Sequence, residues 1–157
     1  VIALRKNFFK DSDRHISIAS SFLETQWFEN IEVRDGLLFL AGGVLMYFEE
    51  EQIKTFFIQA ADHFKNYDLF FDSLSPLGLK IAKKQVLKKG GMGMSMDGGW
   101  ALKAVKSLEK WDKRIKVINS VSMLEGMYQG LSLRRKLLFT IPHMLGVCAM
   151  VHMRIQS

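Results

Sequence analysis

Residues 41–47 place two adjacent glycines and a tyrosine directly after an apolar run, a pattern that can form a ligand site. The run at 37–43 is typical of a buried strand, and Gly42 and Gly43 lack side chains that would keep a ligand away from the backbone. In open parallel α/β sheets, ligands lie beyond the carboxyl ends of the strands, where such turns converge. Tyr47 could then turn back over the bound molecule. The alternative is a tight strand-to-helix turn with a packed tyrosine and no ligand.

The elements that must position this turn follow from the hydrophobic pattern. Short apolar or β-branched runs predict strands at 15–23, 37–43, 68–76, 115–123 and 147–155. Helical spacing predicts helices at 49–65, 77–89 and 101–111, with a short apolar stripe at 2–9. Glu49, Glu50 and Glu51 stand at the positive end of the first of these helices. Because a strand, a helix and a second strand follow in close succession, the predicted class is α/β with a parallel crossover. The stretch 124–146 is helical in parts, and its boundaries stay open.

Composition restricts the class of protein and of partner. The chain has 157 residues and 48% hydrophobic content, which predicts a single domain with one core. The net charge of +6 is spread along the chain, so we expect no nucleic-acid partner. The longest uncharged run, 137–153, is short for a membrane span and contains Pro142, so no membrane association is expected. No secretion signal opens the sequence.

The remaining reactive side chains give weak signals. Cys148 is the only cysteine, which excludes a disulfide framework and favours a reducing compartment, so we expect a cytoplasmic protein with an inert thiol. The histidines lack paired ligand spacing, so no metal site is predicted; they are His15, His63, His143 and His152.

Two features after Pro76 allow more than one interpretation. The glycine- and methionine-rich loop 90–99 is either an adaptable substrate lid or a disordered linker. The lysines at 83, 84, 88 and 89 are interpreted as a solvated helix face rather than an anion site.

Several linked segments together resemble one known family. The succession VIALRKNFF, ISIASSFLETQWFE, LLFLAGGVLMYFEEEQI, FKNYDLFFDSLSPLG and LEKWDKRIKVINSVSM is similar to the carboxyl-terminal part of the leucine carboxyl methyltransferase family, in particular its bacterial branch of polyketide-synthesis O-methyltransferases. The similarity runs in order over residues 1 to 123 and more loosely to the end of the chain. Linked motifs at matching spacing are far more specific than any one of them.

The resemblance implies a class I, Rossmann-like methyltransferase sheet with flanking helices and S-adenosylmethionine as cofactor. Such a sheet has seven strands, the last of which is antiparallel and inserted beside its neighbours. On this template the five predicted strands are the third to the seventh, and the first two are missing. Residues 1–157 would then be the carboxyl-terminal part of a single methyltransferase domain. Without the first strand we expect no continuous sheet, and we expect the missing half upstream in the natural protein.

Site residues follow from the same resemblance. It implies cofactor contacts, at the adenine, from Ser21, Phe22, Leu23 and Glu24, with Trp27 packed nearby. It also implies cofactor contacts at Gly42 and Gly43 and substrate contacts at Val44 and Tyr47. The family usually has aspartate where Glu24 stands and an acid where Gly42 stands. Gly42 has no side chain to make the contact of that acid, to the methionine end of the cofactor or to substrate.

The implied activity is S-adenosylmethionine-dependent O-methylation of a small molecule, a polyketide-like or carboxylate acceptor. Such a transfer depends on aligning the acceptor oxygen with the methyl carbon, and a general base is optional. Tyr47, Asp72 and Asp97 are possible bases by position, with a structural role favoured for each, so no catalytic residue is assigned. The 157 residues alone are expected to be inactive. The alternative is a noncatalytic binding or interaction module that retains half of the fold; a nicotinamide-dependent oxidoreductase would need a GxGxxG after a strand, which is absent. Neither the acceptor nor the oligomeric state can be predicted.

Overall fold

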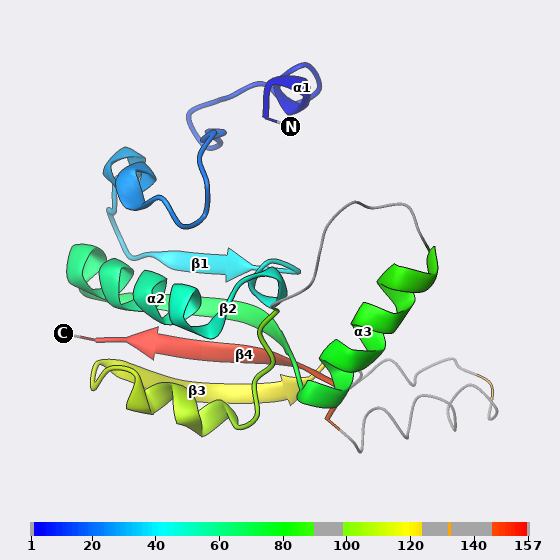
Figure 1. Ribbon diagram of the computed structural model, residues 1–157. Coiled ribbons are helices and arrows are strands. Elements are labelled where there is room, and N and C mark those ends of the chain that lie inside the picture. The colour runs from blue at the N-terminus through cyan, green and yellow to red at the C-terminus, as the bar shows by residue number, and fades with distance from the viewer. Residues whose placement is uncertain (1, 90–98, 124–131, 133–145, 157) are drawn as a thin grey trace.

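The described part of the chain forms one open mixed sheet with helices. The computed structural model describes residues 2–89, 99–123, 132 and 146–156. Its strands are β1 (Leu38–Ala41), β2 (Tyr67–Leu74), β3 (Ile115–Ser122) and β4 (Cys148–Ile155). They lie in the order β1-β2-β4-β3 (Figure 1). β1 and β2 are parallel, and β4 runs antiparallel between β2 and β3. The predicted α/β class is confirmed.

Helices connect the strands and cover one face of the sheet. The α-helices are α1 (Ile2–Lys6), α2 (Glu50–Phe64) and α3 (Pro76–Lys89), and the 3-10 helices are η1 (Thr25–Asn30), η2 (Leu45–Tyr47) and η3 (Val105–Lys110). The helix α2 links the two parallel strands, as predicted, and α3 begins directly after β2. Figure 1 shows α3 beyond the carboxyl ends of β1 and β2. No helix in the described ranges is long and apolar enough to cross a membrane.

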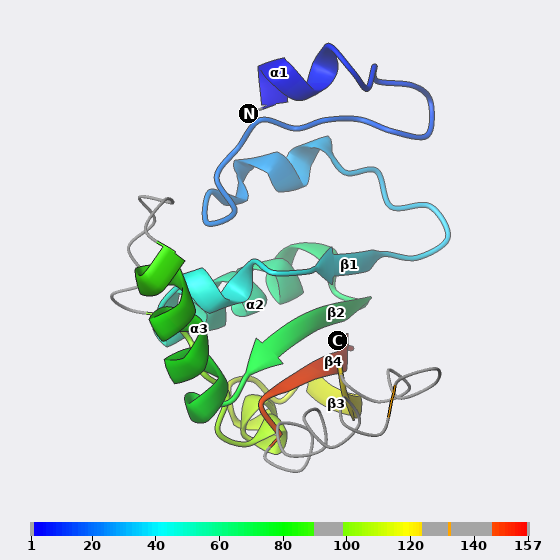
Figure 2. The ribbon, with the colours of Figure 1, turned by 90° about the vertical axis from the view of Figure 1, so that its right-hand side faces the viewer.

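The prediction of a strand at 15–23 is wrong. This segment carries no strand, and it runs outside the sheet between α1 and η1 (Figures 1 and 2). A strand needs a neighbour that pairs with its backbone groups, and no strand of the described part lies beside this one. Ile16 is largely exposed as a result.

The expectation of a discontinuous sheet is also wrong. The four strands pair directly with one another, and β1 occupies an edge of the sheet with β2 as its one partner among the described strands. No contribution from residues 15–23 is needed for that pairing.

The helix predicted at 101–111 is reduced to η3. Leu102 donates its backbone N–H to the carbonyl of Leu74 at 2.8 Å, which ties this segment to the end of β2. Ala104 is extended, and the helical turn begins only at Val105. A tertiary hydrogen bond has therefore replaced the first helical turn that the spacing predicted.

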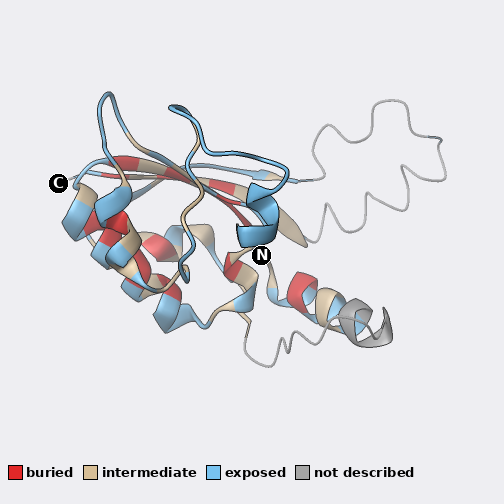
Figure 3. Cartoon of the chain, turned by 90° about the horizontal axis from the view of Figure 1, so that it is seen from above, coloured by how far each residue is buried: buried red, intermediate tan, exposed pale blue. Residues whose placement is uncertain are grey.

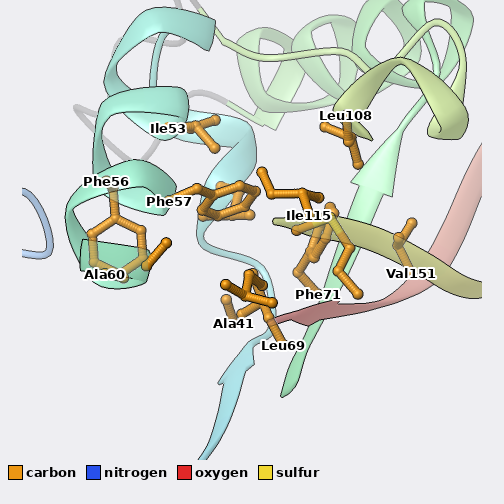
Figure 4. Packing of buried hydrophobic residues seen from close by; sticks show 14 of the residues in the cluster. Ala41, Ile53, Phe56, Phe57, Ala60, Leu69, Phe71, Leu108, Ile115 and Val151 are labelled. Atoms are coloured by element: carbon orange, nitrogen blue, oxygen red, sulfur yellow. The ribbon is translucent and has the colours of Figure 1, made fainter. Parts of the chain in front are cut away.

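The hydrophobic core lies between the sheet and the helices on one of its faces. Alternation along β2 turns Leu69 and Phe71 toward α2, where they meet Phe57. Figure 4 shows side chains of α2, the strands and Leu108 of η3 meeting in this cluster. Figure 3 shows the buried residues concentrated along the strands and the inner sides of these helices. The core thereby fixes the carboxyl ends of β1 and β2 relative to the start of α2.

Candidate functional site

A carboxylate of β2 holds the turn that follows β1. Ala41, the last residue of β1, pairs with Phe71, and β2 continues beyond this pair to Leu74, with Asp72 as its next residue. The backbone N–H of Gly43 donates to Oδ1 of Asp72 at 2.5 Å. Asp72 is only 9% exposed. A charge-assisted hydrogen bond in this setting fixes the turn at the edge where the sequence predicts a ligand.

The two glycines give this turn its shape and leave it open. Gly43 has a φ of +66°, a left-handed conformation in which a side chain would be strained. An ideal Cβ built on Gly42 or on Gly43 meets no heavy atom within 4 Å. The backbone here is therefore accessible, which meets the steric requirement for close approach of a ligand.

The residues predicted to contact substrate lie in and beside η2. Leu45 is fully buried and anchors this single helical turn, and Val44 is half-buried against the core. Tyr47 is 40% exposed, so its ring is available at the surface. Gly99 approaches the turn from a distant part of the chain: a Cβ there would lie 3.1 Å from the carbonyl oxygen of Met46. The structure therefore brings Val44, Tyr47 and the end of the glycine-rich stretch together.

The segment predicted to contact adenine lies against α2. Phe22 packs its ring against Phe56 at 4.1 Å and against Phe48 at 5.2 Å between centroids. Leu23 lines a hollow of about 320 Å³, whose other walls are Glu51, Gln52, Thr55, Phe56 and Gln59. Ser21 and Glu24 are exposed. Phe22 therefore packs against the core, and Ser21, whose hydroxyl accepts the Leu23 N–H at 3.4 Å, and Glu24 are the exposed polar members of this segment.

Trp27 belongs to the aromatic core. Its ring makes an edge contact with the Phe28 ring, with 4.7 Å between the centroids. The Trp27 side chain is partly buried and packs against the hydrophobic core. A second hollow of about 550 Å³ lies beside η1, where Nδ1 of His63 is 3.8 Å from Oε1 of Glu29.

In the ranges that the structure describes, no three His, Cys, Asp or Glu side chains are placed to hold a metal ion.

A polar network that was not predicted from the sequence lies on the other face of the sheet. Oδ1 of Asp68, on β2, is hydrogen-bonded to two side chains of β4. Nε2 of His152 lies at 2.6 Å and Nε of Arg154 at 3.0 Å. Phe70 stacks on the His152 ring at 4.1 Å. Burial alone would raise the pKa of Asp68, but the bonds from His152 and Arg154 lower it overall. The spacing of His152 and Arg154 by two residues on a strand was the available signal, because it places both on one face.

Several predicted features lie elsewhere or outside the described residues. Cys148 is partly buried, and burial, with a smaller effect of the Asp72 charge, raises the pKa of its thiol. Asp97, His143 and most of the loop 90–99 fall outside the described residues. Lys84 is exposed on α3, and the side chains at 88 and 89 are not described.

Comparisons with known proteins give no independent assignment. No family model, no curated protein and no solved structure matches the chain. The features of this chain that bear on function are therefore the turn after β1, the Asp72 carboxylate that binds it and the order of the four strands.

Proposed function

We propose that the protein is an S-adenosylmethionine-dependent O-methyltransferase that acts on a small polyketide-like or carboxylate acceptor. The observation that supports this most is the strand order β1-β2-β4-β3, in which the last strand is antiparallel and inserted between its two predecessors. The sequence resemblance implies this insertion of the last strand. A purely parallel crossover sheet would not contain it.

The open turn supplies the place for the cofactor. The accessible backbone at Gly42 and Gly43 suits the methionine end, because no side chain fills the space above it. Exposed Ser21 and Glu24 are the polar groups offered to the adenine end. The cofactor would supply an electrophilic methyl group, and the protein would hold the acceptor oxygen in line with it. Tyr47, exposed one helical turn beyond the glycines, borders the proposed acceptor side.

The cofactor site also needs groups that the described residues do not provide. A glycine-rich strand-turn-helix and an acid for the ribose hydroxyls are not found in these ranges. β1 has one strand partner here, so its other edge offers unpaired backbone groups for a further strand. We propose that the preceding half of the intact protein pairs at this edge and supplies the cofactor loop.

Calorimetry with S-adenosylhomocysteine on the intact protein tests the proposal. We expect saturable binding with one site per chain, and much weaker binding to residues 1–157 alone. No detectable heat at millimolar ligand, with the folded state verified by circular dichroism, would contradict the enzyme. Tight binding to residues 1–157 alone would instead contradict the proposed need for a preceding half.

One observation favours a noncatalytic interaction module as the second candidate. Leu38 and Leu40 of β1 are 53% and 74% exposed, so the edge strand presents apolar side chains that another polypeptide could cover. The two candidates differ in the calorimetry: a module would bind no cofactor even as the intact protein.

A further inference from the structure

Asp72 is placed to act on a ligand as well as on the turn. It and Ser73 are the two buried polar residues of the described chain, and Asp72 lies two residues before the end of β2, beside the accessible turn. Its Oδ1 accepts the Gly43 N–H at 2.5 Å. The carboxylate thus lies within one hydrogen bond of the backbone over which the sulfonium end of the cofactor is proposed to lie.

Position 42, which directly precedes Gly43 in this turn, is a glycine and has no side chain. A Cβ built on Gly42 would meet no heavy atom within 4 Å, so the space into which a side chain would project is empty. Position 42 therefore contributes no charge to the turn. Among the buried residues of the described chain, Asp72 is the one that is acidic.

We propose that Asp72 supplies, from β2, a negative charge beside the turn, and that it makes the site prefer the sulfonium cation S-adenosylmethionine over the neutral thioether S-adenosylhomocysteine. This inference rests on the proposed function. An ionised carboxylate attracts a nearby sulfonium, and the attraction is stronger where part of the solvent is excluded. The thioether carries no such charge. The ratio of the two dissociation constants therefore isolates the effect of the carboxylate from general damage to the site.

The test is the substitution Asp72→Asn in the intact protein, with both ligands measured by calorimetry. The amide oxygen of asparagine can still accept the Gly43 N–H, so the turn is retained while the charge is lost. We expect the preference for S-adenosylmethionine to fall by roughly five- to tenfold, with a much smaller change for S-adenosylhomocysteine. Asp35→Asn is the matched control, because Asp35 is exposed before the opposite end of β1 and undergoes the same loss of charge.

A second variant tests the role of the empty position. Adding Gly42→Asp to the Asp72→Asn protein returns a carboxylate to the same end of the sheet, where there is room for it. We expect this double variant to regain most of the lost preference. The backbone amide resonance of Gly43 should meanwhile shift little in Asp72→Asn, which verifies that the turn has remained in place.

The outcomes separate this inference from the proposed function. One outcome is that the wild-type protein binds both ligands and that Asp72→Asn weakens the binding of both equally or of neither. Asp72 then does not act through its charge, and the enzyme proposal stands. If the wild-type protein binds neither ligand, the proposed function fails and this inference fails with it. Loss of preference in Asp35→Asn of the same size would also overturn the assignment to Asp72.

Discussion

At the scale of single residues, the best-defined charged group is Arg114, which bridges two elements. Its Nε and Nη2 donate to the two carboxylate oxygens of Asp112 at 2.9 and 2.7 Å, and its Nη1 donates to Asp62 of α2 at 2.8 Å. These bonds, led by the side-chain contact with Arg114 and partly opposed by burial, lower the pKa of Asp112 to about 2. The fork geometry of the guanidinium makes this a specific connection between α2 and the start of β3.

This pair predicts a pH-dependent contribution to stability. The pKa of Asp112 is lower in the folded state than in the unfolded state, so its stabilising effect is complete above pH 4 and is lost as the pH falls toward 2. Asp112→Asn should lower the free energy of unfolding by about 1–2 kcal/mol at pH 7. Urea unfolding between pH 7 and pH 2 measures this, and the difference from wild type should shrink below pH 4. A pH-independent difference, or an equal loss in Asp35→Asn, would contradict this explanation.

At the scale of elements, α2 is fixed at its first turn by a capping box. The backbone N–H of Glu49 donates to Oε1 of Gln52 at 2.9 Å, and the Glu49 side chain accepts from the backbone N–H of residue 52. Two donors that the helix itself cannot satisfy are thereby paired. The cap sits directly after η2, so it also sets where Tyr47 and the turn stand relative to the core.

The capping box predicts unequal effects of two adjacent glutamates. Glu49→Ala should lower the free energy of unfolding by about 1 kcal/mol, because it removes the side-chain acceptor. Glu50→Ala, in the first turn but outside the box, should cost only a few tenths of a kcal/mol through the helix dipole. Chemical denaturation of both variants measures the difference. An equal or larger loss in Glu50→Ala would show that the charge, and not the hydrogen bonds, stabilises this turn.

At the scale of the whole molecule, the sheet has one covered and one exposed face. The core occupies the face beneath α2, whereas Leu38 and Leu40 of β1 are exposed and alternate with the partly buried Phe39 and the buried Ala41. Apolar side chains on a sheet are normally covered, and a large exposed apolar patch marks an interaction surface. The preceding half that we propose to pair at the edge of β1 would also cover these leucines.

The proposed cover over Leu38 and Leu40 leads to a prediction for the intact protein. Leu40→Lys should lower its free energy of unfolding by roughly 2 kcal/mol or more, because an ammonium group would be placed in a packed interface. Leu77→Lys on α3 is the matched control, since Leu77 is also exposed and lies away from this face; its cost should stay near 0.5 kcal/mol. Thermal and urea unfolding provide the values. Equal, small effects at both positions would mean that no segment of the intact protein covers the β1 face.

Part of the fold and of the site was predictable from sequence. The strands at 37–43 and 68–76, the helix between them and the two later strands were predicted correctly apart from their boundaries. The placement of Gly42, Gly43 and Tyr47 at a strand end also followed from the sequence. The prediction of a strand at 15–23 was wrong because no strand of the described part pairs with this segment. The prediction of a helix at 101–111 was wrong in its first turn because Leu102 bonds to Leu74 instead.

The sequence by itself determined the strands at 37–43 and 68–76, the helix between them and the position of the accessible turn, because hydrophobic periodicity and glycine act locally. Only the tertiary structure decided that Asp72 supports Gly43 and that Asp68 joins His152 and Arg154. Those partners are separated by 29, 84 and 86 positions in the chain. Such contacts depend on strand order and register, which no local pattern encodes. The support of the turn after β1 therefore comes from the pairing of two strands, and not from the glycine motif alone.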